Sequence, residues 1–148
     1  MNNIEIFTVY NFNHGVIHTN TEGLTHEDSL KSPAEGGNSI NWVIGHILVS
    51  RDNVNELLGL PKICSEDMIN FYKRGSKPIT SMNAVKLEKL LEMLNESQKK
   101  LEEKIQQIDL KDDEQRARKL AFYSFHEAYH AGQTGLLRRI AGKEGAIK

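Results

Sequence analysis

Two histidines, His126 and His130, lie four positions apart in a segment rich in helix-forming residues. On a helix, side chains four residues apart stack one above the other, with Cβ atoms about 6 Å apart, so both imidazoles can bind one metal ion. The string from His126 to His130 also reads H-E-x-x-H, which is the signature of zinc metalloproteases. The pair therefore predicts metal binding and leaves two kinds of site to distinguish.

A metalloprotease needs a third ligand downstream of this motif, either a histidine in the longer H-E-x-x-H-x-x-G-x-x-H pattern or a more distant glutamate. The glycine and histidine positions of that longer pattern hold Gln133 and Leu136 here. The one acidic residue after His130 is Glu144, in a glycine-containing segment. Neither form of the protease site is complete, so we interpret the match as coincidental.

Glu127 lies between the two histidines in sequence, but not on their side of a helix. One residue along a helix is a rotation of about 100°, so Glu127 need not point at a metal that its neighbours bind. We favour a solvated surface carboxylate for Glu127. A role beside the metal ligands, or as a proton acceptor, stays open.

A third ligand must come from another segment, because catalytic transition-metal sites usually combine three protein ligands with an open position. His46 is the preferred candidate. It lies in the apolar run from Trp42 to Leu48, where an unpartnered imidazole would be costly to bury. Taken alone, His46 is better explained as a hydrogen-bonded core histidine, but the spaced pair elsewhere favours ligation, and Gly45 beside it permits close packing.

The other histidines are weaker candidates. His14 and His18 are also four apart and form a rival pair, but Gly15 and several asparagines around them indicate an exposed helix end. His26 lies in a loop-like stretch and is interpreted as a capping or surface residue. The single cysteine, Cys64, follows Pro61 in a predicted loop and is interpreted as incidental rather than as a nucleophile.

Apolar periodicity predicts four helical segments that would position these residues, at about residues 3–20, 39–58, 81–108 and 112–140. Asn38 and Ser39 offer N-caps for the second segment, and Gly59 and Pro61 end it after Leu58. One short helical turn is expected around residues 68–72. Because strand-like alternation is essentially absent, the predicted fold is all-α, a single up-and-down four-helix bundle over residues 1–148.

In three of these segments, regularly spaced residues form a stripe along one face of the helix, which we expect to face the core. The second has Ile40, Val43, Ile44, Ile47, Val54 and Leu58; the third has Leu87, Leu91, Leu94, Gln98, Leu101, Ile105 and Ile108; the fourth has the small residues Ala117, Ala121, Ser124, Ala128, Ala131 and Gly135. The alternating spacing of the third stripe is typical of a bundle helix that packs at a shallow angle. Gln98 is interpreted as a hydrogen-bonded core amide. The small stripe of the fourth segment predicts close approach of a neighbouring helix.

Composition excludes some classes of partner. The formal net charge is −1, and basic and acidic residues are interleaved, so no basic stripe that would follow a phosphate backbone is present. We therefore expect no nucleic-acid partner, and the charge distribution does not support a role in DNA repair. No run of about 18 apolar residues and no signal-peptide pattern occurs, so we expect no membrane partner and a cytoplasmic location.

Two stretches resemble a known family. Residues 38–46 read Asn-Ser-Ile-Asn-Trp-Val-Ile-Gly-His and continue to Arg51 and Asp52, and residues 126–133 read His-Glu-Ala-Tyr-His-Ala-Gly-Gln and continue through 137–139. Together with the helix order, they resemble DinB-like metal-binding four-helix bundles, relatives of thiol-dependent S-transferases, over essentially the whole chain. The resemblance implies a three-histidine site of His46, His126 and His130, with zinc or nickel as the metal, and a homodimer.

The resemblance also implies a function. Some relatives use low-molecular-weight thiols such as bacillithiol or mycothiol, which makes a metal-dependent thiol S-transferase the preferred expectation, ahead of a metal-dependent hydrolase. Arg51, Arg138 and Arg139 are candidates for binding a carboxylate-bearing cofactor, although surface or ion-pair roles are favoured for them. The alternatives are a non-catalytic metal-binding stress-response module, and a purely structural bundle that holds no metal. The sequence assigns no catalytic residue.

Overall fold

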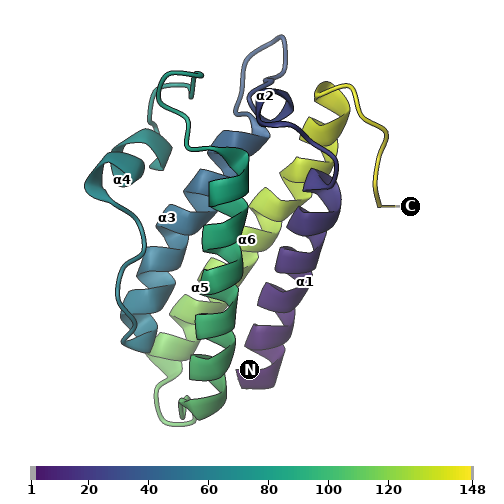
Figure 1. Ribbon diagram of the computed structural model, residues 1–148. Helices are drawn as coiled ribbons and strands as arrows, with labels where there is room; N and C mark the ends of the chain where they lie inside the picture. The colour runs from purple at the N-terminus through teal and green to yellow at the C-terminus, as the bar shows by residue number, and fades with distance from the viewer. Residues whose placement is uncertain (1–2, 148) are drawn as a thin grey trace.

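The structure is a computed structural model that describes residues 3–147, and over this range helices are the only regular secondary structure (Figure 1). Four long helices are α1 (Asn3–Thr21), α3 (Ile40–Leu58), α5 (Leu87–Gln107) and α6 (Glu114–Ile140), and two short ones are α2 (His26–Ser29) and α4 (Glu66–Tyr72). The predicted all-α class is confirmed. Within the described residues, no helix is both long enough and apolar enough to cross a membrane.

The long helices lie side by side (Figure 1). Helices α1 and α3 each pack against both α5 and α6, so α1 and α3 occupy opposite corners of the assembly. Helix α4 covers α3 from outside, and α2 contacts α3 and α5. With neighbours on three sides, α3 buries most of its residues, including the predicted stripe from Ile40 to Leu58. The segment that carries His46 is therefore the most enclosed helix.

The ends of α3 follow from local chemistry, as the sequence predicted. Ser39 is the N-cap, and its hydroxyl accepts a hydrogen bond from the backbone N–H of Trp42 at 3.3 Å. Gly59 ends the helix with φ of 70°, a left-handed conformation that favours glycine. The N–H of Leu60 then reaches back to the carbonyl of Asn55 at 2.7 Å. These two caps fix the length of the helix on either side of His46.

Helix α5 begins at Leu87, later than the predicted start near residue 81. The side chain of Asn83 accepts a hydrogen bond from the N–H of Thr80 at 2.8 Å, and this turn competes with helix formation. His26 Nδ1 accepts the N–H of Leu87 at 3.2 Å, so His26 does act as a capping residue, although at the start of a different helix from its own. The short helix α2 was not predicted; its capping box of Thr25 and Asp28 is the sequence signal for it.

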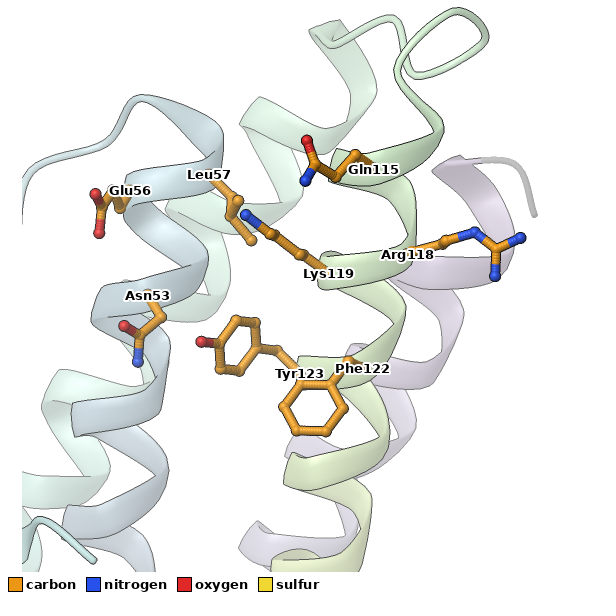
Figure 2. Close-up of a pocket in the computed structure, with 8 residues that line it drawn as sticks. All are labelled: Asn53, Glu56, Leu57, Gln115, Arg118, Lys119, Phe122 and Tyr123. Carbon is orange, nitrogen blue, oxygen red and sulfur yellow. The ribbon is translucent and has the colours of Figure 1, made fainter.

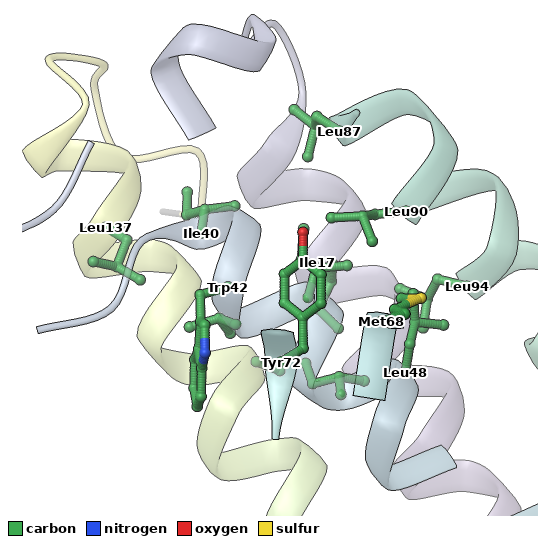
Figure 3. Close-up of a cluster of buried hydrophobic side chains, with 14 residues drawn as sticks. Ile17, Ile40, Trp42, Leu48, Met68, Tyr72, Leu87, Leu90, Leu94 and Leu137 are labelled. Carbon is green, nitrogen blue, oxygen red and sulfur yellow. The ribbon is translucent and has the colours of Figure 1, made fainter. Parts of the chain in front are cut away.

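A buried polar layer divides the apolar core into two clusters. The cluster beside the histidines includes Ile17, Ile40, Trp42, Leu48, Met68, Tyr72, Leu90, Leu94 and Leu137 (Figure 3). The other cluster contains Ile6, Tyr10, Val54, Leu58, Leu101, Ile105, Leu110 and Leu120. Between them along the four long helices lie the buried Asn13, Arg51, Ser97, Gln98, Ser124 and Glu127, which we call the polar layer.

The small residues of α6 allow α1 to approach closely, as predicted. Asn13 donates a hydrogen bond to the carbonyl of Ser124 at 3.1 Å, and Asn20 donates to the hydroxyl of Thr134 at 2.9 Å. At Gly135, a Cβ atom would lie 3.5 Å from the amide nitrogen of Asn20. The predicted stripe of α5 needs two corrections. Leu90 is fully buried where Leu91 was expected, and Ile108 lies after the end of the helix.

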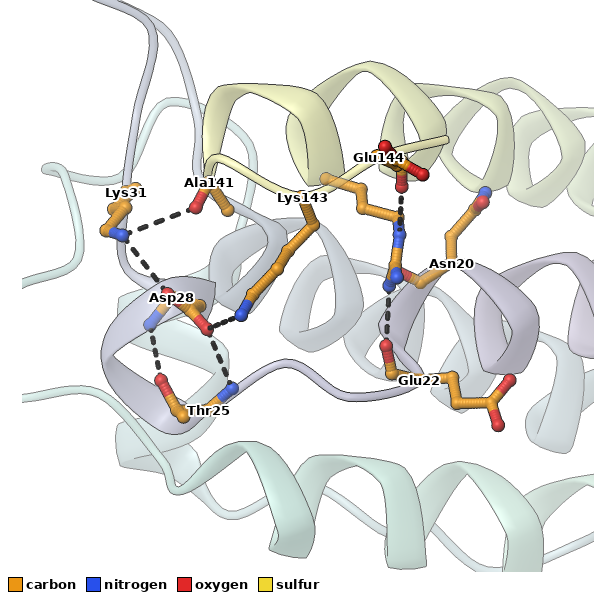
Figure 4. A network of polar contacts seen from close by, with 9 residues as sticks. Asn20, Glu22, Thr25, Asp28, Lys31, Ala141, Lys143 and Glu144 are labelled. Atoms are coloured by element: carbon orange, nitrogen blue, oxygen red, sulfur yellow. Dashed lines mark hydrogen bonds and ion pairs between the residues drawn. The ribbon is translucent and has the colours of Figure 1, made fainter. Parts of the chain in front are cut away.

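Polar contacts tie the C-terminal end of α6 to α1 and α2 (Figure 4). Asp28 accepts hydrogen bonds from the backbone N–H of Thr25 and from the ammonium of Lys31, both at 3.1 Å. Arg138 donates to the carbonyl oxygens of Asn20, Glu22 and Glu144, at 3.1, 2.6 and 2.7 Å. The guanidinium of Arg138 is thus occupied by the protein's own backbone, in a structural role.

Candidate metal centre

The structure brings together the three histidines that the sequence singled out. One ring nitrogen from each of His46, His126 and His130 lies within 4.8 Å of the other two. His46 comes from α3, and the other two come from successive turns of α6. Nitrogens bound to one zinc ion at about 2.0–2.1 Å lie about 3.4 Å apart in a tetrahedral site. Small side-chain rotations would close the observed spacing to that value.

The orientation of His46 is set by a hydrogen bond and by a stacked ring. Its Nδ1 atom lies 2.8 Å from the backbone carbonyl of Tyr72. A carbonyl oxygen only accepts hydrogen bonds, so Nδ1 carries the proton and Nε2 carries the lone pair that a metal needs. The indole of Trp42 stacks on the imidazole, with ring centroids 4.6 Å apart and planes inclined by 10°. Both contacts restrict rotation of the ring.

Tyr72 is a supporting residue that the sequence did not indicate. Its hydroxyl donates to the side-chain oxygen of Asn41 and accepts the N–H of Val85, both at 2.8 Å. Its ring lies against Gly45, where a Cβ atom would be only 2.1 Å from a ring carbon. The bare backbone at Gly45 therefore lets Tyr72 come close enough to hold His46.

The two α6 histidines have different environments. His130 Nδ1 lies 2.9 Å from the side-chain oxygen of Gln133, an acceptor that leaves His130 Nε2 unprotonated. The Nδ1 atom of His126 is buried and has no hydrogen-bond partner among the described residues. Buried polar atoms without a partner are uncommon and often mark an absent ion or water. An orphaned nitrogen on a ring that lies 5.3 and 4.6 Å from the rings of His46 and His130 fits a metal-binding site.

All three imidazoles favour the neutral form. Burial lowers the pKa of His46 and of His130. Burial, together with repulsion from the other two rings, lowers the pKa of His126 to about 4. The imidazoles are therefore unprotonated at neutral pH, which is the state in which histidine binds a metal.

A sequence model of the DinB superfamily matches residues 16–134, a range that contains all three histidines. The chain belongs to the DinB superfamily. No match was found among curated proteins or among solved structures. The family assignment agrees with the predicted resemblance.

In this DinB-superfamily protein, the carboxylate of Glu127 is buried and not solvent-exposed as expected. The prediction of a solvated carboxylate is wrong, because Glu127 is only 3% exposed and pairs with Arg51, whose side chain has no exposed surface. Arg51 Nε and Nη2 donate to the two carboxylate oxygens at 2.5 and 2.8 Å. Arg51 Nη2 also donates to the oxygen of Gln98 at 2.8 Å, which confirms Gln98 as a core amide. The rotation from His126 to Glu127 directs the carboxylate into the polar layer and away from the histidines.

The remaining candidates do not join the site. The rings of His14 and His18 are 4.4 Å apart. His18 lies in the last turn of α1, as expected for a helix end, but both side chains are half-buried rather than exposed, and His14 pairs with Asn95 of α5. No third ligand-type side chain lies close to them among the described residues. Burial and the nearby carboxylate of Asp52 raise the pKa of Cys64 to about 12, so its thiol is not poised as a nucleophile.

Proposed function

We propose that this protein is a metal-dependent enzyme in which His46, His126 and His130 hold one zinc or nickel ion, and that it transfers a low-molecular-weight thiol to an electrophile. The observation that carries the proposal is the convergence of three neutral imidazoles, two of them with their lone pairs directed by second hydrogen bonds. Three protein ligands leave a position open for a reactant, which is the usual catalytic arrangement.

The chain's own residues would prepare the site for such chemistry. Three uncharged ligands do not offset the charge of a divalent ion, so an anionic sulfur is favoured at the open position. Aromatic rings surround the imidazoles: Trp42 and Tyr129 lie 6.4 and 5.2 Å from the His130 ring, and Phe122 lies 6.3 Å from the His126 ring. Of these rings, the buried Trp42 excludes water from one side of the site, whereas Phe122 and Tyr129 are 58 and 60% exposed. When bound, the ion would act as a Lewis acid that lowers the pKa of a thiol.

The proposal can be tested on protein loaded with zinc or nickel. Thiol consumption is followed with glutathione, cysteine and bacillithiol against monochlorobimane, and each of the three histidines is replaced in turn by alanine. Turnover that is lost in each variant, retained in His14→Ala and abolished by a chelator supports the transferase. Absence of turnover with every thiol tested, in protein that holds metal, contradicts it.

A non-catalytic metal-binding module is the second candidate, and it is favoured because the three ligands come from two different helices. We infer that the four long helices form the DinB-type four-helix bundle, with α2 and α4 in its connections, so an ion would link α3 to α6. If the ion stabilises the contact between these two helices, removal of the ion by a chelator should lower the melting temperature strongly. A catalytic site would lose activity on chelation while the fold largely survives. Hydrolysis by the same site would appear as ester or amide cleavage without added thiol.

We also propose that the protein forms a homodimer through the outer face of α6. Phe125, Tyr129, Leu136 and Ile140 are 67, 60, 64 and 40% exposed. Their spacing places them along one face of the helix. Sedimentation equilibrium should give a dimer for the wild type and a monomer for Phe125→Glu. A monomeric wild type at all concentrations tested would refute this proposal.

A further inference from the structure

A groove of about 440 Å³ lies between α3 and α6 (Figure 2), and its lining includes a residue whose ring lies next to that of His126. The walls are formed by Asn53, Glu56 and Leu57 from α3 and by Gln115, Arg118, Lys119, Phe122 and Tyr123 from α6. Phe122 belongs to the groove wall and also lies beside the histidines, since its ring is 6.3 Å from that of His126 between centroids, with the planes inclined by 29°. The volume is in the range typical of small-molecule sites.

Lys119 is the cation that this groove presents to a ligand. Its ammonium points across the groove toward Leu57 (Figure 2), and it has no hydrogen bond or ion pair with any described residue. Arg118 also lines the groove, but it points away and its guanidinium donates two hydrogen bonds to Glu114 at 2.9 and 2.7 Å. The carboxylate of Glu56 is directed away from Lys119 (Figure 2).

Neutral donors and apolar surface complete the lining. The hydroxyl of Tyr123 points toward α3, on the side of Asn53, and the amide of Gln115 lies near the ammonium of Lys119 (Figure 2). Hydroxyl and amide groups can donate hydrogen bonds to a carboxylate beside a lysine. Leu57 offers apolar surface beside the Lys119 ammonium, and Phe122 offers apolar surface further along α6, on the side toward His126 (Figure 2).

We propose that this groove binds the carboxylate of a small acidic thiol whose sulfur reaches the three-histidine site. The inference rests on the proposed thiol transfer and adds the charge and the length of the thiol. Lys119 precedes His126 by seven residues, which is about 10 Å along a helix. The ligand must therefore carry its carboxylate on the order of 10 Å from its sulfur.

The arginines that the sequence offered for such a carboxylate do not serve it. Arg51 is buried against Glu127, and Arg138 is bonded to three backbone carbonyls. Arg139 lines a separate pocket near the C-terminal end of α6. In the described part of the chain, Lys119 is thus the basic side chain that lines the groove beside the histidines and has no ion-pair partner.

The test measures binding rather than turnover, on protein loaded with cobalt in place of zinc. Three probes of similar length are titrated by calorimetry and by absorption of the cobalt ion: 8-mercaptooctanoic acid, 8-mercapto-1-octanol and octanoic acid. Variants are Lys119→Met and the charge-preserving Lys119→Arg, with Lys100→Met as a matched control on the exposed face of α5. Circular dichroism checks that each variant is folded.

The proposal predicts that mercaptooctanoate binds wild type and Lys100→Met about tenfold more tightly than the mercapto-alcohol, since a charge-assisted hydrogen bond is gained. Lys119→Met should abolish this preference and Lys119→Arg should restore it. Equal affinity for acid and alcohol, or a preference that survives in Lys119→Met, would overturn it. If the sulfur adds no affinity over octanoate and leaves the cobalt spectrum unchanged, the proposed thiol chemistry fails, whereas a Lys119-dependent octanoate affinity would still support the carboxylate site.

Discussion

Replacing Glu127 with alanine tests the polar layer that lies beside the candidate metal centre. The change removes two hydrogen bonds to Arg51, of 2.5 and 2.8 Å, and leaves a guanidinium with no exposed surface without its counter-charge. Gln98 and Ser97 continue to accept from Arg51, but neither carries a charge. Breaking a buried ion pair in this way costs about 3–5 kcal/mol. For a protein of 148 residues that is a fall of roughly 10–16 °C in melting temperature.

The free energy of unfolding is measured by urea titration followed by circular dichroism, on metal-free protein. Glu114→Ala is the matched control, because Glu114 and Arg118 form an ion pair with about three quarters of each side chain exposed, which contributes at most about 0.5 kcal/mol. The double variant Arg51→Met/Glu127→Leu should regain most of the stability, since an apolar pair of similar volume avoids the desolvation cost. Equal losses for Glu127→Ala and Glu114→Ala would refute the account of the polar layer.

Two further predictions concern the histidines. In Gly45→Ala, the added methyl group must displace the ring of Tyr72 and with it the carbonyl that orients His46. The zinc affinity, measured by competitive titration with a chelator, should therefore fall about 10- to 100-fold. An unchanged affinity would contradict this role of Tyr72. In the metal-free protein, the pKa of His126 is about 4 when folded and about 6.5 when unfolded. Between these pH values His126 binds more protons in the unfolded chain than in the folded protein. The contribution of neutral His126 to the free energy of unfolding is therefore complete above pH 6.5 and is lost as the pH falls toward 4. In His126→Gln, the urea midpoint should depend less on pH over that range than in the wild type. An identical pH dependence in the variant would count against the lowered pKa.

Local periodicity explains which parts of the site the sequence could predict. The contact between His126 and His130 follows from a spacing of four residues on one helix, and needs no knowledge of the fold. The ends of α3 were predictable because Ser39 and Gly59 are strong local caps. The place of His46 needed more: its apolar surroundings indicated burial, the spaced pair on another helix favoured ligation, and the family resemblance implied the same three histidines.

The contacts that were not predicted depend on residues distant in sequence or on backbone atoms. Burial of Glu127 depends on Arg51, 76 positions away, and a charged residue on a helix is ordinarily expected at the surface. Tyr72 acts on His46 through its carbonyl oxygen, which every residue possesses, so no side-chain pattern announces it. The late start of α5 also depends in part on a distant residue: besides the local turn of Asn83 and Thr80, the hydroxyl of Tyr72 accepts the N–H of Val85 before the helix begins.

Metal content is the most direct test of the central claim that His46, His126 and His130 form one metal site. Protein purified without added metal salts is examined by elemental analysis, for the wild type, for alanine variants of each of the three histidines, and for His14→Ala as a control. We predict about one zinc or nickel ion per chain in the wild type and in the control, and loss of most of that metal in each of the three variants. Stoichiometric metal in all three variants, or none in the wild type, would contradict the assignment.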